Sequence, residues 1–194
     1  VQRIMKMVDS VVLLVDAFEG PMPQTKYVLK KALEQGHRPI VVVNKIDKPN
    51  ARPEDVLYMV YELFIELNAN DLQLDFPVVY ASGKGGFAKE NLEDEGKDMM
   101  PLFETILEHV EDPEGDDSKP MQFLITNIAY DNYVGKLAVG RIHNGIMRRN
   151  QEVMVIKRDG SQYKGKISVL YGYEGLKRVE VQEAHAGDIV CVAG

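Results

Sequence analysis

The stretch RPIVVVNKIDKPNARPED, residues 38–55, decides the fold of the first part of the chain. Its apolar run from Ile40 to Val43 is continuous rather than alternating, which indicates a strand buried on both faces of a parallel sheet. The run stops at NKID, residues 44–47, and Pro, Asn and Arg follow. An amide, an ammonium and a carboxylate therefore stand at the end of a buried strand, where open α/β sheets bind their ligands.

Strand and helix signals alternate on both sides of this stretch. Apolar runs of strand length at 10–17 and 76–83 resemble the run at 40–43. Apolar residues at helical spacing fill the segments between these runs. This alternation predicts a parallel sheet with right-handed crossovers, flanked by helices. The expected helices span residues 21–36, 52–69 and 99–110.

The sequence period changes in the last third of the chain. Short strand-like runs are separated by turn signals, and Asn144-Gly145 and Asp159-Gly160 are predicted to form hairpin turns because Asn, Asp and Gly tolerate positive φ. This pattern predicts an all-β module, and a small barrel is favoured because closure removes unpaired strand edges. The expected strands cover residues 121–130, 135–145, 151–160, 164–173 and 188–194.

The polar segment EDPEGDDSKP, residues 111–120, separates the two regions. It has almost no apolar residue with which to join a core, so it predicts a linker. We expect an α/β domain over 1–112, a linker over 113–119 and the all-β module over 120–194. Charge divides at the same place, because residues 119–194 carry 11 Lys and Arg against 7 Asp and Glu, and residues 1–118 carry 12 against 23.

Composition excludes several classes of protein. The chain of 194 residues is 45% apolar, enough for one large or two small cores, and it has no apolar run long enough to cross a membrane. A single cysteine, Cys191, fits a reducing cytoplasm, and the four histidines lack metal-ligand spacing. The opening VQRIMKM resembles the middle of a helix and the chain ends in a strand signal, so we expect a fragment of a longer protein.

The chemistry of the NKID segment matches one nucleobase. The Asp47 carboxylate can accept two adjacent hydrogen bonds, and only guanine offers N1–H beside an exocyclic amine. Asn44 can donate to guanine N7 or bridge between loops, and the Lys45 stem can lie over the purine ring. Guanine O6 needs a donor, which the backbone of the tight loop ASGKGG, residues 81–86, can supply.

Each of these signals also has an ordinary structural explanation. Asn and Asp after a strand are common turn residues, so NKxD alone does not establish a base site. SGKGG does not meet the pattern of a phosphate loop, because Val78 and Gly85 stand where that loop needs Gly and Ser or Thr. Asp16, at the end of the first expected strand, could ligate a metal, but we expect it to cap a loop.

Together these motifs resemble the guanine-recognition motifs of translational GTPases, and the spacing of NKID and ASGK after two strands carries the likeness. VDAFEGPMPQT (15–25) is similar to the segment after their third motif, and residues 135–156 and 186–194 resemble their β-barrel second domain. With the acidic spacer at 87–103, the resemblance extends to the BipA/TypA subfamily, which is similar to elongation factor G. It implies a partial P-loop-type GTPase domain followed by a translation-factor barrel.

The resemblance implies a role for each residue at the strand ends. Asn44 and Asp47 would bind the guanine base and Lys45 would cover its ring, while Ser82 and Lys84 would shape the second loop. Gly83 would donate its backbone N–H to O6, and the family commonly has Ala there. We expect no catalytic residue and no metal ligand in this chain.

The resemblance also implies what the chain lacks. The family's phosphate loop, switch segments and Asp-x-x-Gly-His motif would precede Val1. The full-length protein would bind GTP or GDP with Mg²⁺ and hydrolyse GTP. Residues 1–194 alone would neither hydrolyse GTP nor carry a bound nucleotide.

The expected partner of the barrel is ribosomal RNA. Its positive balance suits phosphate neutralisation, and we expect a cytoplasmic ribosome-associated factor in translation, ribosome assembly or stress response, without DNA or membrane partners. The candidate RNA contacts are Lys136, Arg141, Arg148, Arg149, Lys164 and Lys166.

Two other functions remain open. The chain could be a non-catalytic RNA- or ribosome-binding module with a degenerate nucleotide domain. It could also belong to a GTPase with the same two-domain core but other work, such as nucleotide-sulfur activation.

Overall fold

The computed structural model describes residues 2–194, and the chain divides into two compact units, 1–112 and 113–194. The predicted opening helix includes Val1, which lies outside the described residues. The residues after it form only a short 3-10 turn, η1 (Ile4–Lys6). Within residues 2–194, no helix is long and apolar enough to cross a membrane.

The first unit contains a sheet with the strand order β1-β2-β3-β4. The strands β1 (Val12–Asp16), β2 (Ile40–Asn44) and β3 (Val78–Ser82) pair in parallel, which confirms the predicted α/β fold. The short strand β4 (Phe87–Lys89) was not expected and runs antiparallel to β3. Gly86 has a φ of 72° in the turn between them, a conformation that glycine adopts without strain.

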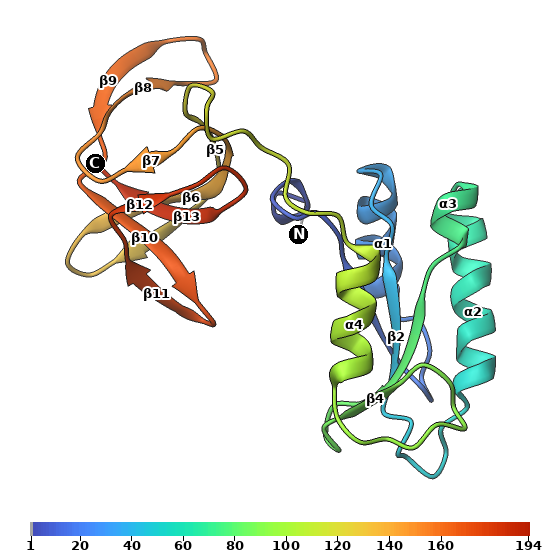
Figure 1. Ribbon diagram of the computed structural model, residues 1–194. Coiled ribbons are helices and arrows are strands. Elements are labelled where there is room, and N and C mark those ends of the chain that lie inside the picture. The colour runs from blue at the N-terminus through green and yellow to red at the C-terminus, as the bar shows by residue number, and fades with distance from the viewer. Residues whose placement is uncertain (1) are drawn as a thin grey trace. The chain divides into compact units, whose positions relative to one another are not determined.

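Helices cover both faces of this sheet (Figure 1). Residues of α1 (Pro23–Glu34) and α2 (Pro53–Glu66) pack on one face, and α4 (Met100–His109) packs on the other. The sequence predicted these three helices but missed α3 (Asp71–Leu74), a single turn whose N-terminus is capped by Asn70. The two helical layers explain why the apolar run of β2 does not alternate, since successive residues face opposite layers and both layers are apolar.

Strand β1 is covered on one face only. Leu13 and Val15 are buried in the cluster that includes α1 and α2. Val12 and Leu14 point to the side of α4, where they remain 46% and 60% exposed. In the part of the chain that the structure describes, no strand pairs with the outer edge of β1.

The second unit is built from antiparallel strands, which confirms the all-β prediction. Its main sheet has the order β11-β10-β13-β6-β5, and two separate ribbons, β12-β7 and β8-β9, complete it. Buried side chains from the main sheet and from β7 form one core cluster. The strands are β5 (Gln122–Asp131), β6 (Gly135–Asn144), β7 (Met147–Arg148), β8 (Glu152–Ile156), β9 (Gln162–Lys166), β10 (Val169–Glu174), β11 (Lys177–Glu180), β12 (Glu183–Ala184) and β13 (Ile189–Ala193).

One of the two predicted hairpins is confirmed. The Asp159-Gly160 turn joins β8 to β9, which pair directly. The Asn144-Gly145 hairpin is wrong, because β7 pairs with β12 instead of returning along β6. Gly145 instead allows two backbone segments to approach closely. Its φ is 74°, and a Cβ at this position would lie 2.5 Å from the Cα of Met121.

The polar segment 113–119 is attached to the second unit, and we call it the strap. The carbonyl of Asp116 accepts a hydrogen bond from the Gly145 N–H at 2.9 Å. The Asp117 carboxylate accepts the Ala186 N–H at 2.9 Å and lies 2.8 Å from His185 Nδ1. Hydrogen bonds, rather than apolar burial, therefore hold this segment in place.

We predict that the attachment of the strap depends on pH. The hydrogen bond to Asp117 raises the pKa of His185 above its ordinary 6.5, with Glu183 and Asp188 adding to the effect. The pKa of Asp117 is lowered, chiefly by the Ala186 N–H and His185. A raised histidine pKa stabilises the folded state below the unfolded pKa, and this contribution is lost as pH rises through the folded pKa. Hydrogen exchange of residues 113–119, corrected for intrinsic rates, should accelerate over that range.

Two variants control this experiment. His185→Asn should remove the pH dependence, whereas His109→Asn, in the first unit, should leave it unchanged. If the corrected exchange rates of the strap do not vary with pH in the unmodified chain, the pair does not hold the strap.

Candidate functional site

Three polar residues close the parallel strands of the first unit at one edge. Asp16 ends β1, Asn44 ends β2 and Ser82 ends β3. The register places Asp16 opposite Asn44, and Asn44 opposite Ala81, the residue before Ser82. Because parallel strands end at a common edge, the predicted NKID and ASGK segments lie on neighbouring loops.

Asn44 joins the loops around it. Its Oδ1 accepts the backbone N–H of Gly83 at 2.9 Å, and its carbonyl accepts the N–H of Ala17 at 2.8 Å. The bridging role expected for the amide is therefore present. The Gly83 N–H, which we expected to serve guanine O6, is donated within the protein.

Ser82 links the second loop to Asp47. The Ser82 side chain is fully buried, and its hydroxyl accepts the Gly85 N–H at 2.9 Å. A hydrogen bond with this hydroxyl is the largest cause that lowers the pKa of the exposed Asp47 carboxyl, and the nearby Lys84 and Lys48 lower it further. Asp47 is thus held ionised, as an acceptor of two N–H donors requires.

Lys45 makes a contact that the sequence did not indicate. Its backbone has a φ of 67°, a left-handed conformation uncommon for a residue with a Cβ. Its Nζ lies 2.7 Å from Asp16 Oδ2. This hydrogen bond is the largest cause that raises the pKa of Lys45, and it is also the largest cause that holds the pKa of Asp16 far below its usual range.

Asp16 also caps the loop that follows it. Its Oδ1 accepts the N–H of Phe18 at 2.8 Å and of Glu19 at 3.2 Å. The predicted loop-capping role is therefore confirmed. In residues 2–194 no group of three or more His, Cys, Asp and Glu side chains is placed to hold a metal ion.

Two glycines of the ASGKGG loop differ in what they require. A Cβ on Gly83 would make only ordinary contacts, 3.6 Å or more from the Asn44 amide, so alanine fits there. A Cβ on Gly85 would lie 2.7 Å from the Phe87 ring and 2.9 Å from Ser82 Oγ. Gly85 therefore allows the close approach that forms the Ser82 contact.

The structure brings the six predicted base-site residues to one sheet edge. Asn44 accepts the Gly83 N–H, Ser82 is the largest cause that lowers the pKa of Asp47, and Lys84 is exposed nearby on the second loop. Their assignment to guanine stays a prediction. Sequence reasoning missed Asp16 as the partner of Lys45, because no local pattern relates residues on separate loops.

The predicted RNA-contact residues of the second unit fall into different environments. Arg141 is only 7% exposed, which leaves its guanidinium little access to a phosphate and does not suit the predicted role. Arg148 pairs with Glu183 at 3.5 Å, and Arg149 pairs with Glu180. Lys136, Lys164 and Lys166 are exposed, and none of them forms an ion pair with a residue that the structure describes.

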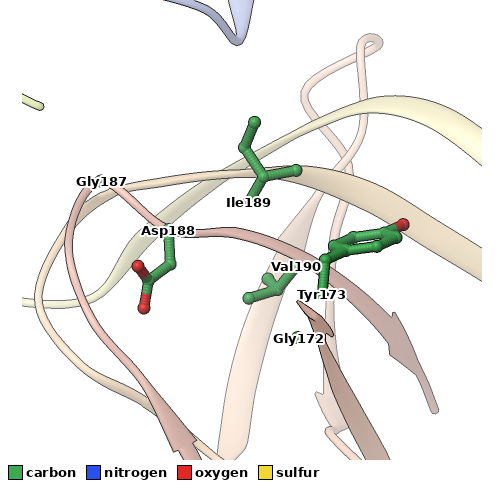
Figure 2. A pocket seen from close by; sticks show the side chains of 6 residues that line it. All are labelled: Gly172, Tyr173, Gly187, Asp188, Ile189 and Val190. Atoms are coloured by element: carbon green, nitrogen blue, oxygen red, sulfur yellow. The ribbon is translucent and has the colours of Figure 1, made fainter. Parts of the chain in front are cut away.

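A shallow hollow on the second unit offers no comparable chemistry. Gly172, Tyr173 and residues 187–190 line it. Figure 2 shows Ile189 and Val190 projecting to opposite sides of β13, with the Tyr173 ring beside them. Of the residues that line it, only Asp188 and Tyr173 have polar side chains, and the Asp188 carboxylate already accepts the backbone N–H of His185 at 2.8 Å.

Comparisons with known proteins agree with both units. The model of the elongation factor Tu GTP binding domain matches residues 1–112, and that of elongation factor Tu domain 2 matches residues 135–194. The chain is 56% identical to the large ribosomal subunit assembly factor BipA of Synechocystis sp., 51% to that of Bacillus subtilis and 48% to that of Escherichia coli. Each alignment covers the whole chain but only 32% of the relative.

A solved structure shares the fold. The apo form of translation elongation factor SelB from Methanococcus maripaludis matches with a TM-score of 0.73 and 20% identity, over 96% of this chain and 36% of that one. The chain spans about a third of the length of the curated relatives that it matches. From the matched domains and these identities, the chain belongs to the family of the elongation factor Tu GTP-binding domain, and within it to the BipA/TypA translational GTPases.

Proposed function

We propose that this chain is part of a guanine-nucleotide-binding protein that hydrolyses GTP and acts in the assembly of the large ribosomal subunit. The observation that carries the proposal is the juxtaposition of NKID and ASGK at one edge of a parallel sheet, with Asp47 ionised beside Ser82. The name of the relatives supports the ribosomal role. A cytoplasmic location follows from that role.

Asp47 would distinguish guanine from other bases. Its two carboxylate oxygens would accept N1–H and the 2-amino group, and adenine would leave the carboxylate without donors. Sites that depend on such hydrogen bonds reject the wrong partner by roughly 10⁴ or more. Binding would draw the Gly83 N–H toward O6 and so compete with its bond to Asn44.

We predict that Asp47→Asn changes the base preference of the full-length protein from GTP to XTP. The asparagine amide can donate to the 2-oxo group of xanthine, where guanine has an amine. We expect the ratio of GTP to XTP affinity to fall by roughly 10²-fold or more. Competition binding with a fluorescent nucleotide measures this ratio.

Asp112→Asn is a matched control, because Asp112 is exposed at the end of the first unit. It should leave the preference unchanged. An Asp47→Asn protein that still prefers GTP would mean that Asp47 does not read the base.

Further chain is proposed to complete the first unit, so that 1–112 is the C-terminal part of a larger GTP-binding domain. The outer edge of β1 lacks a strand partner among the described residues, and Val12 and Leu14 beside it are exposed. Met100, Phe103 and Leu107 of α4 are also exposed, Leu107 by 81%, at the i, i+3 and i+7 positions of one helix face. An additional strand and helix would cover both surfaces.

The phosphate-binding groups would lie in that further chain. Hydrolysis needs donors around the β- and γ-phosphates, a bound Mg²⁺ and a positioned water. The ligands of that Mg²⁺ ion would lie there as well.

Residues 1–194 alone are therefore predicted to bind GTP too weakly for detection at micromolar ligand. Most of the binding free energy would come from phosphate contacts that this part of the protein does not make. Isothermal titration of the isolated chain measures this directly, with the full-length protein as the positive control. Tight, guanine-specific binding by residues 1–194 would contradict the proposal.

The second unit is proposed to contact ribosomal RNA as a translation-factor barrel, with 113–119 as the segment that joins it to the first. Its balance of 11 Lys and Arg against 7 Asp and Glu over residues 119–194 supports phosphate contacts. The β9 lysines are the best placed of the candidates, because Arg148 and Arg149 already pair with glutamates.

We predict that Lys164→Glu with Lys166→Glu weakens binding to ribosomal RNA and reduces its salt dependence. Each lost phosphate contact should lower the slope of log K against log salt by about one. Arg148→Glu with Arg149→Glu should also weaken binding, but less, because glutamates partly neutralise these arginines. Affinity measured over a range of salt tests both pairs, and slopes equal to that of the unmodified protein would argue against RNA contact by the barrel.

A further inference from the structure

Asp16 lies outside both base motifs, yet it contacts the lysine of the first one. We propose that Asp16 is a positioning residue for nucleotide binding, which anchors the ammonium of Lys45 and thereby fixes the stem of that side chain. This inference rests on the proposed function, in which the Lys45 stem lies over the purine ring. It adds to the base site a residue that is 29 positions from Lys45 in the sequence.

The Asp16 carboxylate is held in one orientation. Oδ1 accepts the two backbone N–H groups of Phe18 and Glu19, at 2.8 and 3.2 Å. These bonds prevent the carboxylate from turning, so Oδ2 is presented at a fixed point, 2.7 Å from Lys45 Nζ. The Asp16 side chain is only 15% exposed, which lessens the screening of this pair by water.

The turn that carries Asp16 is in turn attached to the base loop. The Ala17 N–H donates to the Asn44 carbonyl, and the Arg52 N–H donates to the Ala17 carbonyl, each at 2.8 Å. Arg52 Nε donates to the Phe18 carbonyl at 3.1 Å. The anchor and the lysine therefore belong to one hydrogen-bonded assembly, and their separation is fixed by the backbone.

Anchoring matters because of what Lys45 has to do. A free lysine side chain populates many rotamers. A ligand that requires one of them binds less tightly, because restricting the side chain to that rotamer costs conformational entropy. With the ammonium held by Asp16, the stem is already restricted when the nucleotide arrives, which is the general benefit of preorganisation. The stem covers a ring face and reads no base edge, so this benefit should be the same for guanine and hypoxanthine.

Lys48 provides an internal control. Its Nζ lies 3.6 Å from the same Oδ2 atom, so it shares the charge of Asp16. It follows Asp47 on the same loop but has no expected contact with the base. If Asp16 acts through Lys45, then removing Lys48 should leave the effect of Asp16 intact.

The test measures dissociation of a fluorescent GDP, carrying an N-methylanthraniloyl group, from the full-length protein by stopped flow. Asp16→Asn keeps an oxygen for the Phe18 and Glu19 N–H groups but loses the charge that holds Lys45. We expect dissociation to accelerate about fivefold, the size typical of a partly exposed ion pair. The same factor is expected for the corresponding inosine diphosphate.

Double variants separate positioning from general support of the loop. In a Lys45→Met background, Asp16→Asn should cause no further acceleration, whereas in a Lys48→Met background it should still cause about fivefold. Asp16→Glu keeps the charge but moves it by one methylene, so we expect an intermediate dissociation rate. This variant replaces Asp16→Asn in the test if Asp16→Asn does not fold. Equal effects of Asp16 variants in both backgrounds, or no effect in either, would overturn the inference.

The outcome for Asp47 distinguishes the two levels of failure. If Asp47→Asn changes base preference but Asp16 and Lys45 are not coupled, the proposed function stands and only the role of Asp16 fails. If Asp47→Asn leaves GTP preferred, the base site itself is misassigned.

Discussion

The parallel register of β1, β2 and β3 is the constraint on which the candidate site depends. It places Asp16, Asn44 and Ser82 at one sheet edge, although 66 positions of sequence separate the first from the last. The register is fixed by burial on both faces of β2, since a slip by one residue would move each side chain to the opposite layer. The polar side chains at the sheet edge are therefore positioned by the apolar packing of the strands that carry them.

The loops at this edge bind one another as well as offering groups to a ligand. Asn44 accepts the Gly83 N–H, the Ser82 hydroxyl accepts the Gly85 N–H and lowers the pKa of Asp47, and Asp16 pairs with Lys45. Five of the six base-site residues, all except Lys84, thus already interact with another residue of the protein. A nucleotide would exchange some of these contacts for its own, and the partners that it does not displace would keep the loops in position.

The sequence predicted what depends on period and on strand ends. The continuous run of β2 indicated its burial, and the parallel topology then placed NKID and ASGK together. The pairing of Lys45 with Asp16 could not be predicted, because it needs a left-handed φ at Lys45 and a turn formed by Phe18 and Glu19. The Asn144-Gly145 hairpin failed for a similar reason. A glycine in the sequence can indicate either a tight turn or a close approach of two backbone segments. Gly145 serves the second purpose, because a Cβ there would collide with the backbone of Met121.

The charge of the second unit could be counted from the sequence, but the positions of its charged side chains could not be predicted. The surplus of Lys and Arg in the second unit suggests a surface for phosphate, but its arginines are placed differently from its lysines. Glu183 pairs with Arg148 and Glu180 pairs with Arg149. The surface around these two arginines is therefore closer to neutral than the arginines alone would suggest. The lysines of β9 alternate on an exposed ribbon, with Glu152 opposite Lys166 and Met154 opposite Lys164. Since long-range attraction follows the local surplus of charge rather than the total, a polyanion would be drawn to the β8-β9 ribbon first.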